Sequence, residues 1–247
     1  MALVKYGGGV IQMSGSVAGN TFTRNRYGNY VRAKTYPVNP NSSSSNFART
    51  RDEFHQNLIK AAFAMLSDRW SQILTEAQRT AWNLYGASVD MANGLGETIN
   101  LSGYNHYMRS NMILAAAGGT LVDAGPTIFE IPEQDPSVAV TIEMHETRTN
   151  LTFDDTMEWV DEDGAVLWIF EGRPQNPQRN FFNGPWQGCK DKAGSSGDPK
   201  TSPEHFTHLQ ILTTGQRVWY KFSIQRADGR LSQPFYANSV VVAGPIP

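Results

Sequence analysis

The amino-acid sequence predicts an α+β protein: an N-terminal extended β-arm with hairpins, a small helical bundle, and a C-terminal antiparallel β-sandwich of fibronectin type III or immunoglobulin type. Three observations support this fold class. Short β-forming runs alternate with glycine turns up to residue 40, apolar residues recur at helical spacing between 45 and 118, and further short β-runs follow Gly125-Pro126. We therefore place three domains at residues 1–40, 41–125 and 126–247.

The arm, residues 1–40, consists of β-forming runs too short to hold a core of their own. Residues 20–26 lead into a turn at Gly28, and residues 30–35 are followed by Pro37 and Pro40. This pattern predicts small hairpins. An isolated hairpin is only marginally stable in water. We therefore expect the arm to pack on something else, and we favour another subunit over the chain's own helices.

Charge is distributed unevenly along a chain whose net charge is −2. Residues 1–36 contain no acidic residue and five basic ones, Lys5, Arg24, Arg26, Arg32 and Lys34, whereas residues 120–170 contain twelve acids and the single base Arg148. The asymmetry fits head-to-tail contacts between subunits or an arm on an acidic surface. The same asymmetry is equally consistent with two charged surfaces that are merely solvated.

The middle of the chain has the periodicity of helices. A first amphipathic helix is predicted over residues 45–70, from apolar residues three and four apart: Phe47, Phe54, Leu58, Ala61, Ala62, Met65 and Leu66. Thr75 and Gln78 have capping-box spacing and predict a second helix over 76–87. A third helix is expected from near Ser102 to Gly118, and three such helices form a small bundle.

After residue 125 the pattern changes to short strands, at 138–142, 149–153, 165–170, 218–224 and 237–242. Turn signals separate them, and the turn at Asp228-Gly229 before a closing strand is typical of a fibronectin type III module. Residues 173–207 are expected to form a long irregular loop. Its aromatic residues Phe181, Phe182 and Trp186 indicate that the part up to Trp186 docks against the domain.

Signatures of chemistry are weak, and we expect no catalytic, cofactor-binding or metal site. His205 and His208 lack the HExxH pattern, so two partly exposed histidines are favoured over a metal site. Residues 161–164 resemble a calcium loop only faintly, and a solvated acidic turn is favoured. Cys189, the single cysteine, excludes an internal disulfide and indicates a buried or half-buried thiol.

Other classes are also disfavoured. No GxSxG or GxxxxGK[ST] motif occurs, so we expect the chain not to be an enzyme. With no run of eighteen apolar residues and no basic-then-apolar leader, a soluble protein made in a cytoplasm is expected, without membrane partners.

Two binding functions remain as alternatives. Bases of the arm alternate with Phe22, Tyr27, Tyr30 and Tyr36, a mixture suited to nucleic acid, but the charges are few and the whole chain is slightly acidic. Binding of surface carbohydrate is the other alternative, because Phe181, Phe182 and Trp186 in a long loop are able to stack on sugar rings. Burial of these aromatics in the core is favoured.

Three motifs resemble a family of bacteriophage and prophage virion structural proteins. They are GNTFTRNRYGNYVR at 19–32 followed by PVNP at 37–40, LTEAQRTAWN at 74–83 and LSGYN at 101–105. The resemblance implies a Gly-rich β-arm, a helical middle and a β-sandwich in one virion building unit. It implies a virion location after synthesis in the bacterial host, and no catalytic residue.

We therefore expect a non-enzymatic virion structural protein of a tailed bacteriophage, without cofactors, whose partners are copies of itself and other virion proteins. Within the virion, we expect decoration or stabilisation of the capsid first. A tail, baseplate or head–tail connector component and a carbohydrate-binding adhesion module are the alternatives. The candidate subunit-contact residues all lie in the arm: Phe22, Arg24, Arg26, Tyr30, Arg32 and Lys34.

Overall fold

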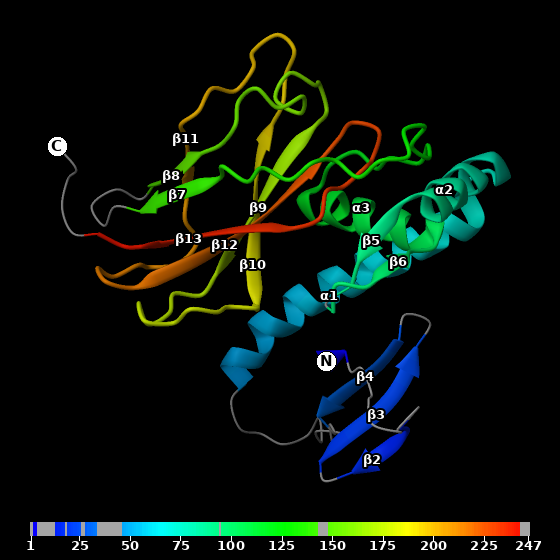
Figure 1. Cartoon of the computed structure of the whole chain (residues 1–247), viewed down its shortest axis with the longest axis horizontal. Helices are drawn as coiled ribbons and strands as arrows, with labels where there is room; N and C mark the ends of the chain where they lie inside the picture. Colours follow the sequence, from blue (N-terminus) through cyan, green and yellow to red (C-terminus); the bar gives the residue numbers. More distant parts are fainter. Residues whose placement is uncertain are drawn as a thin grey trace.

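A computed structural model of the chain describes residues 2–3, 13–17, 19–25, 28–33, 46–93, 95–142 and 148–242. The predicted α+β class is confirmed. Across these residues, three α-helices and a π-helical turn accompany thirteen strands in four antiparallel sheets, so the fold is mostly β (Figure 1).

The N-terminal strands form one four-stranded sheet in the order β1-β4-β3-β2. Its strands are β1 (Ala2–Leu3), β2 (Gly15–Val17), β3 (Asn20–Asn25) and β4 (Gly28–Ala33). The turn before β3 contains Gly19, whose φ of 80° lies in the left-handed region that glycine adopts without strain. The expected hairpins are therefore present, and they are joined into a single sheet.

The helical part consists of α1 (Asn46–Asp68), which continues into a π-helical turn (Arg69–Ile73), α2 (Glu76–Ser88) and α3 (Gly103–Ala117). The capping box is confirmed, because the Thr75 hydroxyl accepts from the Gln78 amide and the Thr75 amide donates to the Gln78 side chain. Between α2 and α3, β5 (Asp90–Ala92) and β6 (Thr98–Asn100) form a short hairpin.

The helices share an aromatic core, and two glycines set its geometry. Trp82 and Tyr107 are fully buried and meet edge to face, with ring centroids 5.7 Å apart. A Cβ at Gly103 would overlap the Trp82 backbone, and one at Gly86 would lie 2.6 Å from the Leu101 carbonyl oxygen. The backbones of α2 and the start of α3 therefore approach as closely as they do only because both positions are glycine.

Seven C-terminal strands form two facing antiparallel sheets, β11-β8-β7 and β10-β9-β12-β13. The strands are β7 (Ala139–Ile142), β8 (Arg148–Thr152), β9 (Val166–Gly172), β10 (Trp186–Ala193), β11 (Glu204–Thr207), β12 (Arg217–Gln225) and β13 (Phe235–Val240). This three-plus-four strand order is that of a fibronectin type III sandwich. Residues from both sheets share one core, in which Phe206 and Tyr220 meet edge to face at 5.4 Å.

One prediction in this region was wrong. Residues 173–207 are not a single irregular loop, because they contain the whole of β10 and the whole of β11. Strand β10 pairs with β9, and its register shifts between Gln187 and Lys190, next to Gly188. The shift and the glycine break the simple alternation by which a strand is recognised in sequence, so only the pairing with β9 defines it.

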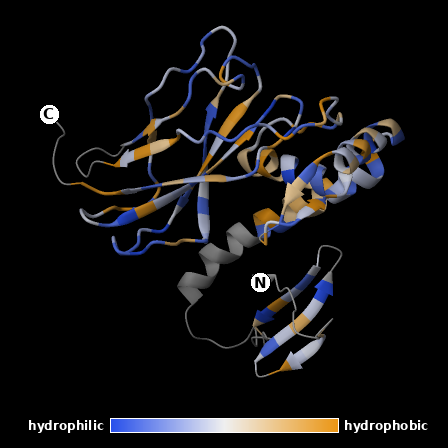
Figure 2. Cartoon of the chain, viewed as in Figure 1, coloured by the Kyte–Doolittle hydropathy of each residue, from blue (hydrophilic) through white to orange (hydrophobic). Residues whose placement is uncertain are grey.

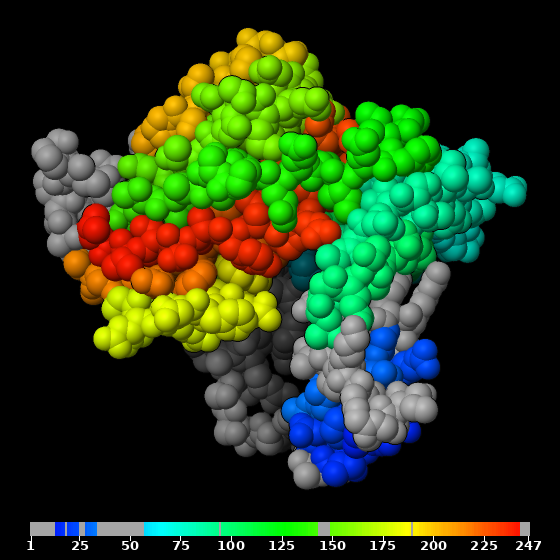
Figure 3. All heavy atoms as spheres, viewed as in Figure 1, coloured from blue at the N-terminus to red at the C-terminus, as the bar shows by residue number. Residues whose placement is uncertain are grey.

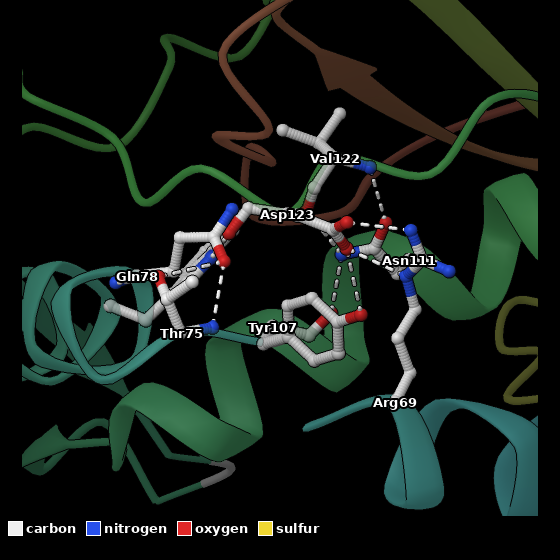
Figure 4. A network of polar contacts seen from close by, with 8 residues as sticks. Arg69, Thr75, Gln78, Tyr107, Asn111, Val122 and Asp123 are labelled. Atoms are coloured by element: carbon white, nitrogen blue, oxygen red, sulfur yellow. Dashed lines mark hydrogen bonds and ion pairs between the residues drawn. The ribbon is translucent and has the colours of Figure 1, made fainter. Parts of the chain in front are cut away.

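Asp123 joins the three helices to the segment that leads into the sandwich (Figure 4). Its carboxylate accepts two hydrogen bonds from Arg69, at 2.7 and 2.6 Å, and one from the Tyr107 hydroxyl at 3.3 Å. Its carbonyl oxygen accepts from the Trp82 indole N–H at 3.0 Å. Next to it, the Asn111 side chain pairs with both backbone groups of Val122, at 2.8 and 3.0 Å.

We expect Asp123→Asn to lower the free energy of unfolding by about 2 kcal/mol at pH 7, because it removes a charge-assisted bidentate pair. Arg69 holds the pKa of Asp123 below its usual value. The stabilisation is therefore complete above pH ~4 and is lost as the pH falls through the lowered pKa of the folded state. Urea unfolding followed by tryptophan fluorescence at pH 7 and pH 3 measures both effects.

Asp198→Asn is the matched control for this experiment. The Asp198 side chain is 87% exposed and lies 3.3 Å from Lys200, so its loss should change stability by less than about 0.5 kcal/mol. Equal effects of the two substitutions would show that Asp123 does not organise the helical part.

Candidate functional site

The register of the N-terminal sheet sorts its side chains onto two faces, since residues directly opposite each other in antiparallel strands point the same way. Phe22 lies opposite Val31, and Arg24 lies opposite Asn29. This face, which β2 extends with Val17, is named here the Phe22 face. Tyr30 lies opposite Thr23 and Arg32 opposite Thr21 on the other side, named here the Tyr30 face.

No described side chain of this sheet is buried. Phe22, Tyr30 and Val31 are half-buried, and Val17 is 56% exposed. Hydrophobic and hydrophilic residues alternate along the strands (Figure 2). Among the described elements, these strands pack extensively only on one another. Within the described part of the chain, the sheet is therefore a single layer, and no second layer of helices or strands packs extensively over its half-buried apolar side chains.

Four of the six predicted contact residues lie in this sheet, and the remaining two, Arg26 and Lys34, lie outside the described residues. Phe22 and Arg24 occupy one face, whereas Tyr30 and Arg32 occupy the other. Among the described residues, each face thus carries one aromatic ring and one guanidinium group. This division weakens the nucleic-acid alternative, because one strand of nucleic acid on either face would meet only one of the two described arginines.

The aromatic residues of the 173–186 segment are used mainly to dock it on the sandwich. Phe182 is buried over Gly172, where any Cβ would overlap the Phe182 ring. Trp186 meets Phe182 edge to face at 5.0 Å and Tyr236 at 5.7 Å. Phe181, by contrast, is 69% exposed. A sugar-stacking role for the three predicted residues would thus rest mostly on Phe181.

The residues weighed as metal ligands form hydrogen bonds and ion pairs with other side chains. The His205 imidazole lies 2.6 Å from the Asn150 side chain, and Asp163 accepts two hydrogen bonds from Ser196. Glu162 pairs with Arg226. Within the described part of the chain, no group of three His, Cys, Asp or Glu residues is placed to hold a metal ion. The Cys189 side chain lies outside the description.

A buried polar seam between α3 and the sandwich was not foreseen from the sequence. Arg109 donates to the carbonyl oxygens of Leu231 and Ser232, and Gln225 donates to that of Ser110 at 3.3 Å. Gln225 in turn accepts from the Trp168 indole at 2.7 Å. Helical and sandwich segments adjoin without a gap in Figure 3. The seam therefore fixes the helical part to the sandwich.

The electrostatics of the seam reflect burial. Burial lowers the pKa of His106 to about 4, with a smaller effect from the Arg109 charge, and lowers the pKa of Arg109 to about 10. The His106 ring packs edge to face on Tyr85, with centroids 4.9 Å apart, and its Nε2 has no hydrogen-bond partner. A hollow beside the seam, lined by Val122, Gln225 and Arg226, has a volume of about 200 Å³. It is smaller than ligand pockets of ~300–1,000 Å³, so we assign the seam a structural role.

No family model and no curated protein matches this chain. Among solved structures, a family 76 glycoside hydrolase from a bovine Bacteroides thetaiotaomicron strain is similar at 14% identity and a TM-score of 0.31, over 45% of this chain and 20% of that one. The adhesin domain of Epf from Streptococcus pyogenes is similar at 17% identity and a TM-score of 0.29, over 47% and 34%. Likeness at this level carries no argument about function. None of the described helices is long and apolar enough to cross a membrane.

Protonation of His106 should destabilise the protein in mild acid. Because its pKa is about 4 when folded and about 6.5 when unfolded, the unfolded chain binds the extra proton between these values. Stability therefore falls as the pH is lowered from about 6.5 to 4, by on the order of 2 kcal/mol. His106→Phe, which keeps a ring against Tyr85, should reduce this dependence by about that amount in urea titrations at pH 7, 5.5 and 4.

The exposed His205 provides the control for this measurement. His205→Gln should keep the pH dependence of the parent protein. A His106→Phe variant that still loses the same stability between pH 6.5 and 4 would place the responsible group elsewhere.

Proposed function

We propose that this chain is a non-enzymatic structural subunit of a tailed-bacteriophage virion, and that its N-terminal sheet binds a neighbouring subunit. The observation that carries the proposal is the uncovered sheet, which has four strands and no buried side chain among those described. Burying apolar surface contributes about 25 cal/mol per Å². A partner that covers the sheet would bury apolar side chains that the described part of the chain does not bury, and would thereby stabilise the sheet.

The edges of the sheet support the same conclusion. Strands β1 and β2 are its outer strands and have two and three residues. Short outer strands limit uncontrolled edge-to-edge pairing, while the faces stay free for a specific partner. Large assemblies commonly use such segments for contacts between subunits, because backbone pairing and apolar burial are gained together.

The virion assignment rests on the sequence resemblance, and the structure explains what the shared motifs contribute. The motif at 74–83 contains the capping-box residues and the core residue Trp82. The motif at 101–105 contains Ser102, the N-cap of α3, and Gly103, the point of closest approach to α2. These residues build the fold, so the likeness is one of architecture. The motif at 19–32 falls in the sheet that we propose as the contact.

Within the virion, we favour decoration or stabilisation of the capsid over a place in the tail, baseplate or connector. A subunit with a rigid body and an uncovered sheet suits attachment to a lattice that is already formed. Either place requires the same contact, so the first experiment tests the contact and the virion location together.

Deletion of residues 1–40 should abolish incorporation into particles while leaving the rest of the chain folded, because the helical and sandwich cores contain no residue of the sheet. Particles produced from a prophage carrying the tagged gene would be purified on a density gradient and analysed by mass spectrometry. The full-length chain should band with the particles, and the deleted chain should stay at the top of the gradient.

Circular dichroism and thermal unfolding of the deleted chain serve as the folding control. Particles that contain the deleted chain at normal levels would contradict the role of the sheet. A full-length chain that never bands with particles would contradict the virion assignment.

A further inference from the structure

Helix α1 carries an apolar stripe that is only partly covered. At 3.6 residues per turn, one side of the helix presents Leu58, Ile59, Ala62, Phe63 and Leu66, named here the α1 stripe. Leu66 is fully buried and belongs to the helical core. One and two turns earlier, Phe63 is 51% exposed, Ile59 47% and Leu58 44%.

The uncovered part of the stripe follows from how far α1 extends. Helix α1 packs on α3 near its C-terminal end, and its N-terminal part extends beyond α2 and α3 (Figure 1). The opposite side of the same helix carries Asn57, Lys60 and Ala64, all exposed. The helix is therefore amphipathic over residues that its own bundle does not reach, and the exposed stripe is continuous with a buried contact.

The chain has a second apolar surface that its described residues cover only in part. The Phe22 face of the N-terminal sheet presents Phe22, Val31 and Val17, none of them buried. A helix lying on one face of a sheet is a standard two-layer arrangement, in which each element covers the apolar side of the other. The Tyr30 face is less suited to this contact, because it carries Ser16, Thr21 and Thr23 beside Tyr30.

We propose that the α1 stripe receives the Phe22 face of the N-terminal sheet of a second copy of this chain. Within the described part of one chain, α1 and the strands of the sheet make no extensive contact, and Phe63 and Ile59 stay about half exposed while Phe22 is half-buried. The inference rests on the proposed function and names the surface on which the sheet binds. Because each subunit offers one sheet and one stripe, the contact is heterologous and continues from copy to copy.

Two substitutions test the two surfaces separately. Phe63→Glu places a charge on the stripe, and Phe22→Glu places one on the sheet face. Their matched controls are Ala64→Glu, on the polar side of α1, and Thr23→Glu, on the Tyr30 face of the same strand. Light scattering after size exclusion, over a range of concentrations of the full-length chain, measures the assembly of each variant.

The parent chain and both controls should form species larger than a monomer. Phe63→Glu and Phe22→Glu should each weaken assembly about 10- to 100-fold, the equivalent of losing one buried aromatic side chain. The decisive measurement mixes these two variants. The intact sheet of Phe63→Glu fits the intact stripe of Phe22→Glu, so the mixture should give a heterodimer and nothing larger.

The mixture remains informative even if Phe22→Glu unfolds its own sheet, because the heterodimer does not use that sheet. A mixture that stays monomeric, or a Phe63→Glu variant that assembles like the parent while Phe22→Glu does not, would overturn the inference and leave the proposed function intact. A parent chain that is monomeric at every concentration yet enters particles through residues 1–40 would overturn it as well. Unchanged assembly in both variants, together with normal incorporation of the chain lacking residues 1–40, would reject both proposals.

Discussion

The paired hydrogen bonds between Arg69 and Asp123 hold the three helices to the segment that leads into the sandwich. Asp123 lies in an irregular segment, and its carboxylate and carbonyl contact the π-helical turn, α2 and α3 through Arg69, Trp82 and Tyr107. Such a segment would otherwise leave its backbone groups unpaired against the helices. Val122, held by Asn111, then lies against the turn at Gly229, where a Cβ would come within 3.1 Å of the Val122 side chain. One acidic residue thus sets both the order of the helices and the position of the sandwich.

The seam beyond this point uses burial in a way that favours a fixed geometry over maximum stability. Arg109 is largely buried, and its described partners are the carbonyl oxygens of Leu231 and Ser232. A guanidinium group whose solvation is replaced by neutral acceptors is tolerated only where its orientation is correct. The Nε2 of His106, which has no hydrogen-bond partner, lies in the same seam and adds a second polar group whose burial is not fully compensated.

Features that neighbouring residues determine were predictable from the sequence, and features that depend on residues far apart in the chain were not. The capping box at Thr75 and the turn at Asp228-Gly229 are decided by neighbouring residues, so short motifs identify them. Strand β10 and the hairpin β5–β6 depend on partners in space, and Asp123 gives no local signal of its role. Phe22, Arg24, Tyr30 and Arg32 lie in strands, as the sequence of the arm predicted, and their role in subunit contacts stays a prediction. Their division between two faces depends on register, and a shift of one residue would reverse it.

The apolar surface of the proposed contact is divided between two elements of the chain. Phe63 and Ile59 are about half exposed on α1 beside the exposed Lys60, and Phe22 and Val31 are half-buried in the sheet beside the exposed Arg24. In the contact that we propose, a subunit that uses its sheet on one neighbour and its α1 stripe on another would be held at both surfaces at once. Specificity would then come from geometry, because only a neighbour in the correct orientation covers the sheet and offers its own helix to the next copy.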